Sequence, residues 1–387
     1  MRVIIIGSSA AGLSCAETLR KGSDAQIAII GQEKVKPYFR PVLSHMILSD
    51  KTEERFFLKP DDFYEKNNIE LILDSEVTTI ETKEKNITLK DGSKMSYDKL
   101  VLSVGSYNFI PPIKGVEKRG IFDLKYFSDI EKINSYCSNK ENIVVIGGGL
   151  LGIEAAWAFL HAGKKVTILE FMPRLMARQL SEEASRIVKD ELEKAGIKVL
   201  LGKSTKEIVG GEHVEKIILE SGEELPADIV FFSIGVRANV SLAKEAGLEV
   251  DRGIVVNQNM QTSDSDIYAI GDCAQLGQMV PGIWPIAMQM GKIAASHILG
   301  QSLEMKVNPP IAMLKALDIG VYSAGDVSKQ DDSLTIHDGE DYKYFSFENG
   351  KLTGINLLGN SKLSSKAPKM LAQQMSKSEV EQLLGEM

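Results

Sequence analysis

This sequence of 387 residues has few cysteines and no long apolar run, and its 45 basic residues are outnumbered by 53 acidic ones. The three cysteines, Cys15, Cys137 and Cys273, are scattered, and their spacing fits neither a disulfide framework nor a metal site. No apolar run approaches the ~18 residues that a membrane-spanning helix needs. The net charge of −8 argues against general nucleic-acid binding, although a local basic docking patch is compatible with it.

The composition is otherwise that of an ordinary globular protein, with 43% hydrophobic and 25% charged residues. The length corresponds to about two or three domains. The chain enters an apolar strand directly after Met1 and Arg2, which leaves no room for a signal peptide. We therefore expect a cytoplasmic protein.

The most informative segment is residues 141–170, ENIVVIGGGLLGIEAAWAFLHAGKKVTILE. It predicts a buried strand, a G-x-G-x-x-G turn, a helix, and a second buried strand that stops on an acid. In this pattern Gly147 allows the tight turn, Gly149 lets the backbone approach a pyrophosphate, and Gly152 lets helix and strand pack closely. The helix N-terminus offers unpaired N–H groups and a positive dipole end to the phosphates. A glycine-rich turn of another α/β protein is the alternative, but the complete pattern favours a dinucleotide.

The acid at the end of the second strand bears on the choice of nucleotide. Glu170 can accept hydrogen bonds from both hydroxyls of an adenosine ribose. A carboxylate there would repel a 2′-phosphate, which favours NADH over NADPH. Arg174 and Arg178 follow closely and weaken that preference.

A second copy of the pattern opens the chain. The apolar run from Arg2 to Ile6 precedes Gly7-Ser8-Ser9-Ala10-Ala11-Gly12, and a helix is expected through Leu19. Ser9 stands where the middle glycine is expected, so the backbone is slightly less free to approach a ligand. The acid, Glu33, lies three residues past the end of the next strand. Two dinucleotide folds in one chain suggest two dinucleotides.

The two halves also repeat farther along the chain. Residues 86–105 align without a gap on residues 216–235, with six identical positions. Both segments read as a hairpin, a buried strand and a terminal glycine, Gly105 or Gly235. The chain therefore contains two related nucleotide-binding modules.

A third strand signal lies in residues 250–274, where Ile267 to Ile270 leads into Gly271-Asp272. A helix from Ile286 to Leu299 is expected to follow. An Asp at a strand end can bind a polyol hydroxyl, and without further context it would be interpreted as a helix N-cap.

Together these motifs resemble the FAD-dependent pyridine nucleotide oxidoreductases, over about residues 1 to 300. The resemblance implies an α/β fold of two Rossmann-like, glutathione-reductase-like domains with a small α+β C-terminal domain. FAD would bind residues 1–107 and 235–302, NADH would bind residues 108–234, and residues 303–387 would form the third domain. It further implies that Glu33 binds the FAD ribose, that Asp272 binds the ribityl chain, and that Glu154 lies beside nicotinamide and flavin.

Within the family, residues 36–44, KPYFRPVLS, resemble the P-Y-x-R-P-x-L-S segment of rubredoxin reductases, of ferredoxin reductases in oxygenase systems and of nitrite-reductase flavodomains. The resemblance implies that Arg40 and Ser44 line the FAD diphosphate and ribityl region. Trp284 is expected either at the flavin edge or in a core or interface.

The C-terminal residues predict a small antiparallel sheet from Ile311 to Ile319 and from Asp341 to Leu357, closed by one or two helices from Lys366 onward. By resemblance, Lys315 aligns with a flavin-contacting position, although a solvated strand-edge lysine is an equal alternative. The expected cofactor-binding residues are Gly7, Ser9, Ala10, Ala11, Gly12, Glu33, Arg40, Ser44, Val77, Ser103, Gly105, Gly147, Gly149, Leu151, Gly152, Glu170, Gly235, Asp272, Ile283 and Lys315.

This chain lacks the redox cysteines of the family's disulfide reductases, and their absence bears on the reaction. The C-x4-C pair is absent, and Val42-Leu43-Ser44 stands where related peroxidases and oxidases carry a redox cysteine. We expect Cys15 and Cys273 to serve packing rather than redox chemistry. No metal site is expected.

Three hypotheses follow for the function. The first is an NADH:rubredoxin oxidoreductase, or a relative that delivers electrons to ferredoxin or another small carrier, acting as a monomer or homodimer. The second is an NADH oxidase that reduces oxygen at the flavin. The third is a nucleotide-binding or regulatory subunit whose flavin is structural.

Overall fold

A computed structural model of the protein describes residues 1–49, 56–305, 309–314, 316–317, 319–328, 330–339, 341–359 and 362–385. The chain divides into two compact units. The first comprises Met1–Val42, Thr52–Tyr107 and Val236–Val307, and the second comprises Leu43–Lys51, Asn108–Gly235 and Asn308–Met387. Among the described residues, no helix has the length and apolar character needed to cross a membrane.

The first unit is built on a parallel sheet with five described strands in the order β19-β7-β1-β2-β3. Isoleucine and valine dominate the strands because β-branched side chains pack well on a pleated surface covered on both faces. Ile4 and Ile5 in the central strand are fully buried, and each such burial stabilises the fold by roughly 1.5–3 kcal/mol. The strands are β1 (Arg2–Ile6), β2 (Gln26–Ile30), β3 (Ile69–Ile72), β7 (Lys99–Leu102) and β19 (Ile267–Ala269).

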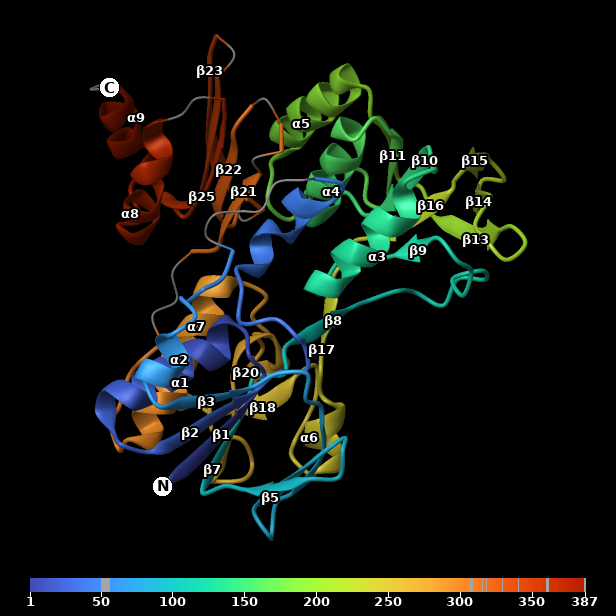
Figure 1. Cartoon of the computed structure of the whole chain (residues 1–387). Coiled ribbons are helices and arrows are strands. Elements are labelled where there is room, and N and C mark those ends of the chain that lie inside the picture. Colours follow the sequence, from blue (N-terminus) through green and yellow to red (C-terminus); the bar gives the residue numbers. More distant parts are fainter. Residues whose placement is uncertain are drawn as a thin grey trace. The chain divides into compact units, whose positions relative to one another are not determined.

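Helices α1 (Ala10–Gly22) and α7 (Trp284–Ile298) pack side by side in this unit (Figure 1). A Cβ atom on Gly291 of α7 would lie 2.4 Å from the backbone oxygen of Ala11, so only glycine permits this crossing. Helix α7 begins earlier than the sequence predicted, because Pro285 in its first turn has no N–H group to leave unpaired. Helix α1 also extends farther than predicted.

The second unit contains a corresponding parallel sheet, with five described strands in the order β12-β11-β10-β16-β9. Helix α5 (Glu182–Ala195) is amphipathic, begins at the Ser181 cap and ends at Gly196, whose φ of 106° is left-handed. The strands are β9 (Ile121–Phe122), β10 (Asn142–Ile146), β11 (Lys165–Glu170), β12 (Lys198–Leu201) and β16 (Ile229–Phe232). Helices α3 (Phe127–Cys137) and α4 (Leu150–His161) belong to the same unit.

The predicted internal repeat is confirmed strand by strand. Each aligned segment forms an antiparallel hairpin followed by a strand of the parallel sheet, and both hairpins turn at a glycine with positive φ, 87° at Gly92 and 84° at Gly222. The repeated strands are β5 (Asn86–Leu89), β6 (Lys94–Ser96) and β7 in the first copy, and β14 (Lys216–Leu219), β15 (Glu224–Pro226) and β16 in the second. The hairpins are completed by β4 (Val77–Glu81) and β13 (Thr205–Val209).

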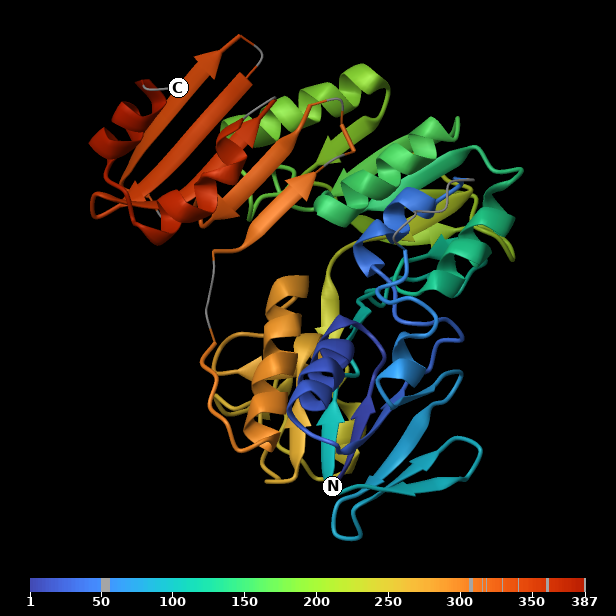
Figure 2. The ribbon, with the colours of Figure 1, turned by 60° about the vertical axis from the view of Figure 1, so that its left-hand side comes forward.

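The C-terminal residues form the predicted antiparallel sheet, in the order β21-β22-β25-β24-β23, with two helices beside it (Figure 2). Asn349 and Gly350, which join two of these strands, both have positive φ, as a tight hairpin turn requires. The elements are β21 (Ile311–Leu314), β22 (Val321–Gly325), β23 (Asp332–Asp338), β24 (Asp341–Glu348), β25 (Lys351–Leu358), η3 (Lys362–Ser365), α8 (Ala367–Ala372) and α9 (Lys377–Gly385).

A buried polar seam joins this sheet to the rest of the second unit. The fully buried Asn356 accepts a hydrogen bond from the Ser181 N–H at 2.8 Å and donates to the Gln179 carbonyl at 2.9 Å. The Ser323 hydroxyl donates to the same carbonyl at 2.6 Å. Since each buried polar group has a partner, the seam fixes the sheet against the residues that precede α5.

The remaining elements are short connections. They are η1 (Arg40–Met46), α2 (Phe63–Lys66), β8 (Ser106–Asn108), β17 (Val236–Ala238), α6 (Ser241–Glu245), β18 (Ile254–Val256), η2 (Gly271–Cys273) and β20 (Ala274–Leu276).

Candidate functional site

The first glycine turn lies between β1 and α1 at the carboxyl end of the first sheet. Gly7 has a φ of 115°, and a Cβ atom there would lie 2.0 Å from the Ser103 carbonyl oxygen. A Cβ atom on Gly12 would lie 2.2 Å from the Gly7 oxygen. Both positions therefore require glycine. Ser9, which replaces the middle glycine, is the N-cap residue of α1, but its side chain makes no capping hydrogen bond.

A polar cluster follows β2 in the same unit. Arg40 forms an ion pair with Glu33, with 2.8 Å between Nη2 and Oε1, and the Tyr38 hydroxyl donates to the other carboxylate oxygen at 2.9 Å. The Arg40 guanidinium also lies over the Tyr38 ring. The cluster holds the carboxylate that the sequence assigns to the FAD ribose in one orientation.

Asp272 lies in η2, directly after β19. Ser106 is buried, with 1% of the residue exposed, and its hydroxyl donates to the Asp272 carboxylate at 3.0 Å. The N-cap alternative for Asp272 does not apply to α7, whose N-cap is Ile283. Trp284 begins that helix, and its ring packs edge-on against Phe39 with 5.3 Å between centroids.

All three cysteines are buried. Burial raises the pKa of Cys15 to about 12 and the pKa values of Cys137 and Cys273 to about 11. The thiolate, which is the reactive form, is therefore disfavoured at neutral pH. The expected burial of Cys15 and Cys273 is confirmed.

The second glycine turn, between β10 and α4, repeats the geometry of the first. Gly147 has a φ of 117°, and a Cβ atom there would lie 2.1 Å from the Ser233 oxygen. A Cβ atom on Gly152 would lie 2.0 Å from the Gly147 oxygen. In contrast, a Cβ atom on Gly149 would meet nothing within 4 Å. The open side of Gly149 is where a pyrophosphate could approach the backbone at the start of α4.

Glu170, at the end of β11, accepts hydrogen bonds from two backbone N–H groups. Gly148 donates at 2.5 Å and Met172 at 2.7 Å. The Arg174 guanidinium donates to the carbonyl oxygens of Leu180 and Ala177, at 2.7 and 2.9 Å. Arg174 thus stabilises the loop after β11. Because its guanidinium is engaged there, it is less available to bind the 2′-phosphate of NADPH.

Ser44 and Glu154 meet within the second unit. The Ser44 hydroxyl, on η1, donates to the Glu154 carboxylate on α4 at 2.9 Å. Arg40, which the family resemblance grouped with Ser44, forms its ion pair with Glu33.

The remaining candidates that the structure describes lie in several separate elements. Val77 lies opposite Leu89 in the β4–β5 hairpin and packs on the core of the first unit. Ala10 and Ala11 are buried in the first turn of α1. Lys315 lies outside the described residues. Leu151 is in the first turn of α4, and Gly105 and Gly235 have positive φ at equivalent places after β7 and β16.

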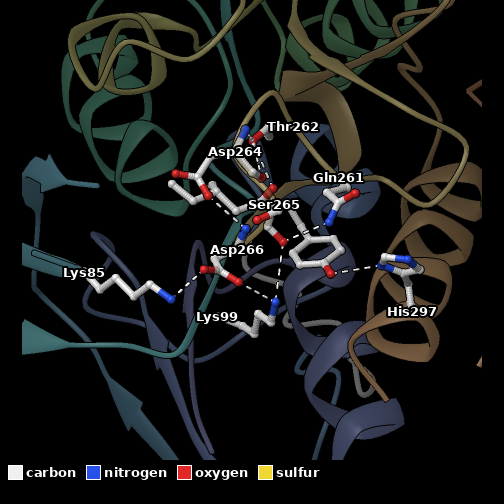
Figure 3. Close-up of polar contacts among 10 residues, drawn as sticks. Lys85, Lys99, Gln261, Thr262, Asp264, Ser265, Asp266 and His297 are labelled. Atoms are coloured by element: carbon white, nitrogen blue, oxygen red, sulfur yellow. Dashed lines mark hydrogen bonds and ion pairs between the residues drawn. The ribbon is translucent and has the colours of Figure 1, made fainter. Parts of the chain in front are cut away.

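Several polar side chains that fix strand ends were not predicted. Figure 3 shows Asp266, just before β19, held by Lys85 and Lys99 with 2.5 Å between each ammonium and a carboxylate oxygen. Asp98 accepts from the Arg2 N–H at 2.6 Å, and Asp228 accepts from the Asn142 N–H at 2.8 Å. Positions 98 and 228 both carry Asp in the two aligned segments of the repeat, and this was the sequence signal that could have pointed to these two contacts. Among the described residues there is no cluster of His, Cys, Asp or Glu that could hold a metal ion.

The two turns fit dinucleotides by donor chemistry and by space. Each presents the N-terminus of a helix of 12 or 13 residues and each requires glycine where the chain passes closest to a neighbouring strand. In each unit a carboxylate lies at or just after the end of the second strand. The residues present could therefore hold one dinucleotide in each unit.

Two family models match the chain. Residues 1–291 match the pyridine nucleotide-disulphide oxidoreductase model, and residues 310–375 match the model of the rubredoxin NAD+ reductase C-terminal domain. The first match covers well over half of the chain.

Curated relatives and solved structures agree with these matches. The chain is 31% identical to the NADH-rubredoxin oxidoreductase of Clostridium acetobutylicum, over 96% of this chain and 94% of that protein. It is 34% identical to the assimilatory nitrate reductase electron transfer subunit of Bacillus subtilis, over 93% of this chain but only 48% of that protein. The chain thus spans about half the length of some curated relatives that it matches. The putidaredoxin reductase in a covalent complex with putidaredoxin is similar with a TM-score of 0.88 and 26% identity, over 97% of this chain and 94% of that one.

Proposed function

Because the chain belongs to the pyridine nucleotide-disulphide oxidoreductase family, whose members use FAD and NADH, we propose that it takes electrons from NADH and passes them to a small electron-carrier protein. Rubredoxin is the carrier that we favour, since the C-terminal residues match the rubredoxin reductase C-terminal domain. FAD would bind the first module and NADH the second, with residues 303–387 as a third domain.

The observation that carries this proposal is the combination of two dinucleotide turns with three buried thiols. Both turns require glycine where the backbone passes closest to a neighbouring strand, as the dinucleotide-binding pattern does. All three cysteines of the chain are buried with raised pKa values, so none is suited to relay electrons as a thiolate. FAD, when bound, would accept a hydride and release electrons singly.

The chain's own residues would bind and orient the two nucleotides. The N–H groups at the starts of α1 and α4 would face the two pyrophosphates. Glu33, fixed by Arg40 and Tyr38, would accept hydrogen bonds from the FAD ribose, and Asp272 would bind a ribityl hydroxyl. Glu170 would read the ribose of NADH. Glu154 would orient the nicotinamide and would not transfer a proton.

An anaerobic two-stage titration tests the proposal. NADH is added to the FAD-loaded protein, oxidised rubredoxin is added next, and both absorption spectra are followed. We expect the flavin to bleach and the rubredoxin then to lose its colour at catalytic protein concentration. If the flavin bleaches but rubredoxin and ferredoxin stay oxidised, the carrier assignment is wrong. If the reduced flavin is then reoxidised by air and its reoxidation is unaffected by added carrier, the protein is an NADH oxidase. Flavin that NADH does not bleach would contradict the whole proposal.

A further inference from the structure

Ser44 is held rigidly in the second unit. Ser44 is 1% exposed, and the nearby Leu43 and Ile47 are each 2% exposed. The segment is also tied to α3 through Asn134, whose side chain accepts from the Leu48 N–H at 2.8 Å and donates to the Met46 carbonyl at 3.4 Å. The Ser44 hydroxyl therefore has little freedom to move.

The partner of that hydroxyl is the carboxylate of Glu154, at 2.9 Å. Glu154 lies in the N-terminal half of α4, two residues after Gly152 of the second glycine turn. Side chains on an α-helix lean toward its N-terminus, so this carboxylate leans toward the end of α4 that faces the turn. Glu154 is half-buried, and a glutamate has three rotatable side-chain bonds that must be fixed if it is to orient a ligand.

We propose that Ser44 is a positioning residue for Glu154: its buried hydroxyl selects the carboxylate conformation that orients the nicotinamide. A hydrogen bond to an ionised carboxylate is short and strong, and its donor here is fixed by burial and by the Asn134 contacts. The inference rests on the proposed function, since it concerns how NADH is oriented. It assigns Ser44 to the nicotinamide end of the reaction in place of the FAD diphosphate.

If Ser44 positions Glu154, its removal should affect the rate of flavin reduction by NADH much more than the affinity for the nucleotide. Most of the affinity for NADH would come from the adenosine and pyrophosphate halves, which bind at Glu170 and the glycine turn. Ser44→Ala should therefore leave the Kd for NAD+ within about twofold. It should slow the bleaching of flavin by NADH about tenfold, as expected when one charge-assisted hydrogen bond that orients the reacting group is lost.

The experiment compares five variants of the FAD-loaded protein: Ser44→Ala, Ser44→Thr, Glu154→Gln, the double variant Ser44→Ala/Glu154→Gln, and Ser185→Ala. Ser185 is the matched control, because it is a buried serine of the same unit whose hydroxyl donates to the Leu175 carbonyl at 2.8 Å. NAD+ binding is measured by titration calorimetry, and flavin bleaching by anaerobic stopped-flow. Thr should restore the rate, Ser185→Ala should keep it, and the double variant should be no slower than Glu154→Gln alone.

The outcomes separate this inference from the proposed function. Wild-type protein that NADH does not bleach would overturn both. If the wild type is bleached, three results overturn the inference alone: an unchanged rate in Ser44→Ala, a slow Ser185→Ala, or additive losses in the double variant. Additive losses would mean that Ser44 does not act through Glu154.

Discussion

The two nucleotide-binding modules share one backbone course but differ at the point where they would bind a ribose. In both, the first glycine of the turn donates to the end of the neighbouring strand, Gly7 to Ile30 at 2.7 Å and Gly147 to Leu169 at 2.8 Å. The residues that directly follow these two acceptors are Gly31 in the first module and Glu170 in the second. The same position thus carries glycine in one module and the acid in the other.

The difference has a steric cause. A Cβ atom on Gly31 would lie 2.3 Å from the Ser8 hydroxyl oxygen, so the first module has no room for an acid there. In the second module Gly148 replaces Ser8, and its N–H donates to Glu170. The acid of the first module, Glu33, is displaced along the chain and is held by side chains. The same fold thereby presents its carboxylate at a different position in each module.

The largest effects are expected from the glycines that both modules require. Gly7→Ala and Gly147→Ala each place a Cβ atom about 2 Å from a carbonyl oxygen at a positive φ. Each should destabilise its own module by on the order of 3 kcal/mol or more. We expect Gly7→Ala to lose FAD on purification. Gly147→Ala should stay yellow and resist bleaching by NADH. Loss of FAD from Gly147→Ala but not from Gly7→Ala would reverse the assignment of the modules.

Glu170→Ala tests the acid that distinguishes the second module. Removing a carboxylate that accepts from Gly148 and Met172 should weaken NADH binding roughly tenfold or more. NADPH binding should change less, because its 2′-phosphate no longer meets a negative charge. The ratio of the two Kd values checks this, with Glu182→Ala as an exposed control in the same unit. An unchanged ratio would mean that another residue reads the ribose.

Gly149→Ala separates ligand contact from folding. The φ of Gly149 is −81°, and a Cβ atom there would meet nothing in the chain. We expect the free energy of unfolding to change by less than about 1 kcal/mol, whereas NADH binding falls about tenfold because the methyl group enters the space of the pyrophosphate. Urea denaturation and NAD+ calorimetry measure the two effects. Unchanged binding would mean that the pyrophosphate lies elsewhere.

The smallest effect concerns Asp266, which lies just before the strand β19 of the first unit. Hydrogen bonds from Lys85 and Lys99 hold the pKa of Asp266 below its usual range. Its contribution to stability is therefore present above about pH 4 and is lost as the pH falls further. Asp266→Asn should lower the free energy of unfolding by about 1 kcal/mol at pH 7 and by progressively less below pH 4. A constant loss across that range would show that charge is not the cause.

Much of this architecture could be predicted from the sequence because strand, turn and helix signals are local. Gly147 and Gly152 were recognised from the spacing of the glycine pattern, and the two hairpins were recognised from the internal repeat. Contacts between distant segments were not: Ser44 with Glu154, and Asp266 with its two lysines, depend on how the chain returns on itself. Asp98 and Asp228 were partly predictable. The repeat showed that the two positions carry the same residue, but the backbone groups that they bind could be identified only in the structure.

The central claim is that one chain holds two different dinucleotides at two separate sites. The most direct test loads the protein with FAD, removes the excess, and titrates NAD+ by calorimetry while free flavin is monitored by fluorescence. We predict that one equivalent of NAD+ binds per FAD and that no flavin is released. Displacement of FAD by NAD+, or the absence of NAD+ binding to the FAD-loaded protein, would contradict the claim.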